Sequence, residues 1–262
     1  MQEMPGLQSN SITNRLPALC LLAAALVIRS LASAQSIPLS YESEDGQFKY
    51  ILHNELTRED IEVTASVLED YYRRVLSDLN VESVPKTTVT IWNDPASYYR
   101  VQEETTGQRF EGSGGYAWWG AAPELRLQHS TRRGAAIGAL HEFAHIVSMA
   151  RNKTIPNNPR WLWEATALYA TRDLQPSRIP IFIMQRDFPT LSELNVGFNY
   201  ANEQRSIYDV GFFLAEYIVE NWGNEAIGQL VESNGDIPTT LKVSVSEFEQ
   251  GWITFLTANY LD

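Results

Sequence analysis

The first half of the chain combines two spacings of apolar and polar positions. Alternation with a period of two, rich in β-branched residues, predicts four strands, at residues 48–52, 86–92, 116–119 and 124–128. Apolar positions three or four apart predict a helix of about five turns over residues 61–79. Asn93-Asp94-Pro95 follows the second strand and is typical of a helix start. These elements predict a mixed α/β front half.

From residue 133 onward the apolar positions follow the helical spacing. This pattern predicts five helices, at residues 133–150, 160–172, 210–221, 225–232 and 246–261. We therefore predict an α+β protein with an all-helical back half. A chain of 262 residues that is 44% hydrophobic and 20% charged can form a globular domain with one hydrophobic core. The expected domain spans residues 35–262, with an α/β lobe at 35–130 and a helical lobe at 131–262.

The N-terminal residues have the layout of a secretory signal peptide. Arg15 precedes an apolar run at residues 16–28, and the small residues Ala32-Ser33-Ala34 follow before Gln35. An uncleaved membrane anchor is the alternative, but the run is shorter than the about 20 residues that cross a bilayer. We predict a signal peptide at residues 1–34, no membrane span after its cleavage, and a secreted, periplasmic or cell-envelope location.

Cysteine content and charge narrow the possible chemistry. The only cysteine, Cys20, lies inside the apolar run of the signal peptide, so the mature chain would have no thiol for catalysis or metal binding. Any metal must then be held by His, Asp or Glu. The formal net charge of −12 repels phosphate backbones, which excludes nucleic acid as an expected partner.

One short motif carries metal chemistry. His141-Glu142-Phe143-Ala144-His145 is an HExxH sequence within the predicted helix 133–150. Four residues advance a helix by about 400°, so both imidazoles project from one face, about one turn apart, as zinc ligands require. Glu142 falls beside that face, where its carboxylate can hold a water molecule. The alternative is a chance match on a surface helix.

A catalytic zinc site of this kind needs a third protein ligand. A metzincin would place glycine and histidine three and six residues after His145, but Ser148 and Arg151 occupy those positions. Glu164 is the better candidate, because it lies in an otherwise apolar helix and a buried carboxylate needs a compensating charge. A capping or salt-bridged glutamate is the alternative interpretation.

The two metal-ligand segments resemble the gluzincins, in particular the peptidase MA-like group related to aminopeptidase N. In that family the third ligand follows the second histidine after eighteen residues, and here residues 146–163 separate His145 from Glu164. The family segment Trp-Leu-x-Glu-Gly-x-Ala-x-Tyr is matched by Trp161, Leu162, Glu164, Ala167 and Tyr169. The resemblance implies a thermolysin-like catalytic domain, in which a mixed sheet lobe precedes a helical lobe.

The match to the family is incomplete. Ala165 replaces the usual glycine, and Leu168 stands where thermolysin-like enzymes have an acidic residue, which points away from thermolysin itself. The exopeptidase Gly-x-Met-Glu-Asn strand has no convincing counterpart. The family also has a Tyr-x-x-Gly segment at the head of a later helix, similar to Tyr208-Asp209-Val210-Gly211. The resemblance implies that Tyr208 hydrogen-bonds the oxyanion of the intermediate, while a core or capping tyrosine is the alternative.

Together these features predict a secreted zinc metallopeptidase with one zinc per chain, held by His141, His145 and Glu164. Its substrate would be a peptide or protein, hydrolysed by zinc-activated water with Glu142 as general base. Two alternatives are a catalytically silent envelope scaffold of the same fold and a zinc hydrolase of a non-peptide substrate. We also expect strand 124–128 to be a sheet edge that pairs with extended substrate. Trp118 and Trp119 could line the cleft, and the alternative for them is packing in the core or at the rim.

Overall fold

A five-stranded mixed sheet is built from the first half of the chain. The computed structural model describes residues 37–175, 177–195 and 205–261. The strands are β1 (Leu39–Glu42), β2 (Phe48–His53), β3 (Thr87–Trp92), β4 (Gly115–Trp119) and β5 (Pro123–Gln128). Their order is β1-β2-β3-β5-β4; the inner strands β2, β3 and β5 run parallel, and both outer strands pair antiparallel. The α+β class predicted from the sequence is confirmed.

The prediction that strand 124–128 is the sheet edge is wrong: the edge is the next strand in the sheet order. Strand β5 lies inside the sheet, parallel to β3 on one side and antiparallel to β4 on the other. Strand β4 is therefore the edge. The alternation of buried and half-buried residues in β5 has the same period at an edge or inside a sheet, so it identifies a strand and one covered face but not its neighbours.

The helices follow the predicted ranges closely. They are α2 (Glu62–Asp78), α3 (Pro95–Thr106), α4 (Arg132–Arg151), α5 (Arg160–Ala170), α6 (Ile181–Met184), α7 (Leu191–Leu194), α8 (Ile207–Trp222), α9 (Glu225–Glu232), α10 (Ile237–Leu241) and α11 (Val245–Leu256), with a π-helical turn at Thr257–Leu261. Helix α8 begins three residues before its predicted start because Ser206 and Asp209 form a capping box.

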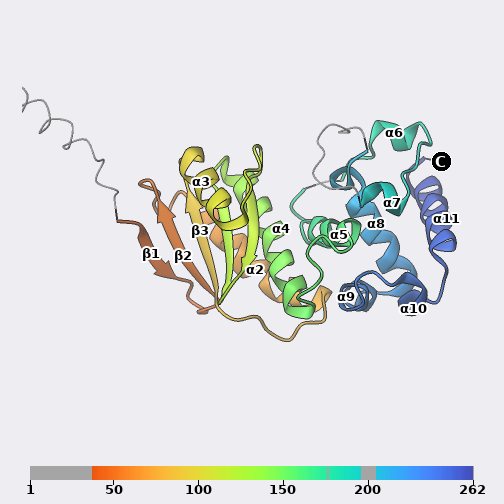
Figure 1. Cartoon of the computed structure of the whole chain (residues 1–262), viewed down its shortest axis with the longest axis horizontal. Helices are drawn as coiled ribbons and strands as arrows, with labels where there is room; N and C mark the ends of the chain where they lie inside the picture. Colours follow the sequence, from red (N-terminus) through yellow and green to blue (C-terminus); the bar gives the residue numbers. More distant parts are fainter. Residues whose placement is uncertain (1–36, 176, 196–204, 262) are drawn as a thin grey trace, which may run out of the picture. The chain divides into compact units, whose positions relative to one another are not determined.

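Helix α4 joins the sheet to the helical half of the chain. It contacts β4 and β5 on one side and α2 and α5 on the others (Figure 1). Thr131 caps its N-terminus by accepting a hydrogen bond from the Gly134 N–H. Small residues such as Ala136 and Ala139 are buried on it, and Phe143 packs edge-on against Phe48 of β2. A helix held on several sides is a rigid base for the side chains that it carries.

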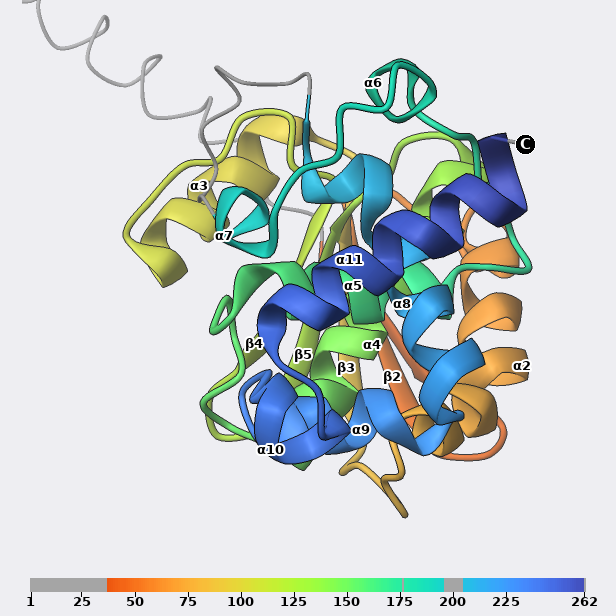
Figure 2. The ribbon, with the colours of Figure 1, turned by 90° about the vertical axis from the view of Figure 1, so that its right-hand side faces the viewer.

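The second support of the structure is the close packing of α8 on α5. A Cβ atom at Gly211 would lie 2.7 Å from Leu168 Cδ1 and 3.1 Å from the Ala165 Cα, so only glycine permits this approach. Helix α11 packs on α8 in turn (Figure 2). The Tyr-x-x-Gly segment noted in the sequence is thus the point where α8 meets the helix that carries Glu164.

The predicted signal peptide at residues 1–34 lies outside the described residues. Among the helices of the described ranges, none is both long and apolar enough to span a membrane.

Replacing Gly211 with alanine should destabilise the protein. The added methyl group must displace the α5 backbone, and overpacking of this kind costs about 1–3 kcal/mol. Gly138→Ala on α4 is the matched control, because a Cβ there meets nothing within 4 Å and alanine favours the helix. Thermal unfolding should show a lower Tm for Gly211→Ala and an equal or higher Tm for Gly138→Ala. Equal Tm values for both variants would contradict the close-packing argument.

Candidate metal centre

Helix α4 presents His141 and His145 on one face, as their four-residue spacing requires. Their ring centroids are 4.7 Å apart, and the two ring planes are nearly perpendicular. His145 is buried, and one face of its ring stacks on Trp163 at 3.8 Å between centroids. The sequence did not single out Trp163, which fixes the plane of the deeper imidazole.

Helix α5 brings Glu164 to the same point. Its Oε2 atom lies 3.3 Å from His141 Nε2 and 3.7 Å from His145 Nε2. One possible ligand atom from each of the three residues lies within 4.8 Å of the others. Glu164 is only 2% exposed, so its carboxylate is removed from bulk water.

The arrangement fits a bound metal ion. Tetrahedral zinc with bonds of about 2.0–2.1 Å separates its ligand atoms by about 3.3 Å, close to the two contacts of Glu164 Oε2. That oxygen is buried and has no hydrogen-bond partner among the described residues. A cation bound between the imidazoles and the carboxylate would satisfy it. His141, His145 and Glu164 therefore form a buried group that could hold a metal ion.

The electrostatics of the group suit cation binding. Burial by itself would raise the pKa of Glu164, but the His141 contact and the nearby charges of both imidazoles and Arg160 lower it to about 2. Burial, together with the charge of His141, holds the pKa of His145 well below its usual range. The charged Glu164 and the neutral His145 are in the protonation states that metal binding requires. Burial would lower the pKa of His141, but the contact with Glu164 and the charge of Glu142 raise it, so this imidazole must release its proton when a metal binds.

Glu142 lies beside the ligands, against the edge strand β4. A Cβ at Gly115 would come within 3.1 Å of Glu142 Cγ, so the glycine leaves room for this side chain. Burial raises the pKa of Glu142 to about 7, although the charge of His141 and the backbone N–H of Ala117 oppose the shift. The structure thus brings the carboxylate predicted as a base next to a strand edge.

Tyr208 also reaches the group, from the first turn of α8. Its hydroxyl donates to Glu164 Oε1 at 3.1 Å, and its ring centroid is 6.4 Å from that of His141. The residue is 44% exposed, so it lies between the buried ligands and solvent. In this conformation the hydroxyl is paired with the ligand carboxylate.

Arg160 is a site residue that the sequence reasoning missed. It is the first residue of α5, one helical turn before Glu164, and is only 4% exposed. Its guanidinium lies 3.4 Å from Glu164 Oε1 and donates to the Tyr208 hydroxyl at 3.2 Å. A basic residue at a helix start is usually a solvated one, so the sequence carries no signal of its burial.

The two tryptophans of β4 lie at the rim rather than in the core. Trp118 is 37% exposed, and Trp119 is half-buried with the ammonium of Lys153 2.8 Å from its ring centroid. Lys153 follows α4, so this contact ties the end of the edge strand to the loop that leads to α5.

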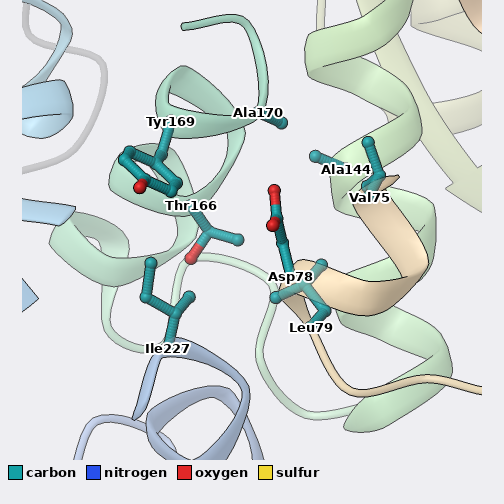
Figure 3. Close-up of a pocket in the computed structure, with 8 residues that line it drawn as sticks. All are labelled: Val75, Asp78, Leu79, Ala144, Thr166, Tyr169, Ala170 and Ile227. Atoms are coloured by element: carbon teal, nitrogen blue, oxygen red, sulfur yellow. The ribbon is translucent and has the colours of Figure 1, made fainter. Parts of the chain in front are cut away.

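A small cavity lies between α2, α4, α5 and α9. Residues such as Asp78, Thr166 and Ile227 line it (Figure 3). Its volume of about 10 Å³ is enough for at most one water molecule. It is too small to be a substrate pocket.

No protein-family model matches this chain, and a comparison with curated proteins finds no match. The functional conclusion therefore depends on the sequence motifs and the geometry of the site.

Metal content should distinguish a ligand from its neighbour. We expect the protein, purified without chelators, to bind one divalent metal ion per chain. Glu164→Ala should lose it because a ligand is removed, whereas Glu142→Ala should keep it because the three ligands remain. Elemental analysis of the folded proteins checks both expectations. Metal-free wild-type protein, or full occupancy in Glu164→Ala, would show that these residues are not the metal site.

Proposed function

We propose that the protein is a zinc-dependent peptidase with a thermolysin-like catalytic domain, which acts outside the cytoplasm. The observation that carries the proposal is the convergence of His141, His145 and Glu164, with the Glu142 carboxylate beside them. A structural metal site has no use for an additional acid next to its ligands. A hydrolase needs one, to move the proton of the attacking water.

A zinc ion bound by the three ligands would supply Lewis-acid chemistry, which acidifies water and stabilises negative charge on a carbonyl oxygen. Glu142 would accept the proton of the water as it attacks and then deliver it to the leaving amine. The Glu142 side chain is half-buried against β4. This position holds its carboxylate at the site and limits proton exchange with bulk water.

Tyr208 is the candidate donor to the oxyanion. Its hydroxyl is already within hydrogen-bond distance of a Glu164 oxygen, and the residue is exposed enough for a substrate to reach it. Rotation of the hydroxyl from Glu164 toward the substrate would place a donor where charge develops. Such donors act mainly in the transition state.

The edge strand β4 supports a peptide as the substrate. The N–H of Gln128 donates to the Gly114 carbonyl, so the alternating residues Ala117 and Trp119 direct their backbone groups away from β5. No described strand pairs with that edge. An extended peptide could add to it, with its scissile carbonyl next to Glu142. The role assigned to strand 124–128 from the sequence thus passes to β4.

Loss of the Glu142 carboxylate should slow hydrolysis strongly without loss of the metal. Glu142→Gln removes proton transfer and should lower kcat by on the order of 10²-fold or more. Glu220→Gln, on the exposed surface of α8, is the control for loss of one acidic group. Digestion of a peptide library by the metal-loaded proteins, read by mass spectrometry, measures the effect. Unchanged cleavage by Glu142→Gln would refute the proposed mechanism.

The neighbouring glycines Gly114 and Gly115 offer a finer test of Glu142 placement. Alanine at 115 would meet Leu127 Cδ2 at 2.8 Å and Glu142 Cγ at 3.1 Å, whereas at 114 it meets nothing within 4 Å. We expect Gly115→Ala to displace the carboxylate and lower kcat, by on the order of 10²-fold if the shift is about 1 Å. Metal content should not change, and Gly114→Ala should retain the wild-type kcat. Equal kcat values for the two variants would contradict the placement.

A further inference from the structure

Arg160 presents a physical problem that the proposed mechanism does not solve. A guanidinium is always charged, and this one is buried beside a group that could bind a divalent cation. Two cations in a site of low dielectric repel each other. A buried charge in such a place must therefore make contacts that outweigh the repulsion, and those contacts indicate its purpose.

Among the described residues, the guanidinium joins the loop before α5, α5 itself and α8. One terminal nitrogen donates to Asn157 Oδ1 at 2.9 Å, in the loop before α5, and lies 3.4 Å from Glu164 Oε1. The other donates to the Tyr208 hydroxyl at 3.2 Å, on α8. A loop, a candidate metal ligand and a candidate oxyanion donor are thus held by one planar group. A lysine, with a single nitrogen, could not reach all three in this geometry.

The contacts divide the two oxygens of Glu164 between different partners. Oε1 receives the Tyr208 hydrogen bond and the charge of Arg160, while Oε2 is the atom near both imidazoles. Oε1 is thereby kept from turning toward the metal position. Hydrogen bonds that orient a ligand in this way change metal affinity by about 10–100-fold in other proteins.

We propose that Arg160 is a positioning residue that restricts Glu164 to binding metal through Oε2 and holds the Tyr208 hydroxyl beside the site. The proposal rests on the metal-dependent function proposed above. It predicts effects on metal affinity and geometry that removal of an ordinary buried ion pair would not cause.

The test compares Arg160→Met with Arg172→Met. Arg172 pairs with Asp78 at 2.7 and 3.2 Å, near the other end of α5, so its loss removes a half-buried ion pair and leaves the candidate ligands in place. Zinc affinity is measured by competition with a chelator, and geometry by the visible absorption spectrum of the cobalt-substituted proteins. We expect Arg160→Met to bind zinc at least about 10-fold more weakly and to change the cobalt spectrum. Arg172→Met should alter neither, even if its Tm falls.

Asn157→Gly provides a second variant that leaves every buried charge in place. Residue 157 has a φ of 52°, which glycine adopts readily, so this change deletes only the carboxamide that anchors Arg160. It should weaken zinc binding in the same direction but less than Arg160→Met, while Arg160→Lys should not restore the wild-type affinity. Wild-type affinity and spectrum in Asn157→Gly and in folded Arg160→Met would overturn the proposal. If Arg160→Met fails to fold, the Asn157→Gly result alone decides.

A double-mutant cycle with Tyr208→Phe tests the second half of the proposal. If Arg160 acts through the tyrosine, the losses in kcat caused by Arg160→Met and Tyr208→Phe should be less than additive in free energy. Fully additive losses would overturn that half. Zinc binding without peptide hydrolysis would refute the peptidase function alone, because affinity and spectrum still test Arg160. A wild-type chain that binds no zinc would refute both.

Discussion

The structure depends on one constraint, the burial of the Glu164 carboxylate. A charge so far from water is tolerated only if its surroundings compensate it, and here the compensating groups come from α4, α5 and α8. Helices α4 and α8 must therefore come close to the Glu164 carboxylate on α5. Gly211 permits the approach of α8, and the alanines of α4 permit its burial between the sheet and α5. The contacts that pack α4 and α8 on α5 are therefore also the contacts that bring the site residues together.

The sheet contributes to the site through its edge rather than its face. Because β4 is antiparallel to β5 and outermost, it brings a line of small residues, Gly115 and Ala117, against the helix that carries Glu142. A larger residue at position 115 would occupy the space of the carboxylate. Gly115 is thus part of the candidate site, although in the sequence it is indistinguishable from its neighbours in a glycine-rich turn.

Local patterns predicted the elements, and tertiary contacts decided what the patterns left open. The HExxH spacing and the apolar neighbours of Glu164 are local signals, so the candidate ligands were identifiable before the structure. The short elements β1, α6, α7 and α10 were missed because four or five residues do not establish a period. Arg160 was missed for another reason. Its burial depends on Tyr208, which lies 48 residues away, and on a helix crossing that no local window contains.

The two carboxylates of the site differ because their neighbours differ. Glu164 faces Arg160, Tyr208 and two imidazoles, and these contacts favour its charged form, with a pKa of about 2. At Glu142 burial is the largest effect, the charges of His141 and Glu164 act in opposite directions, and the pKa rises to about 7. Two acids whose pKa values are driven apart by their surroundings can take separate roles, one permanently charged and one able to exchange a proton. Arg160 contacts the Glu164 carboxylate, and this charge suits the proposed division of roles, with Glu164 as a metal ligand and Glu142 as a base.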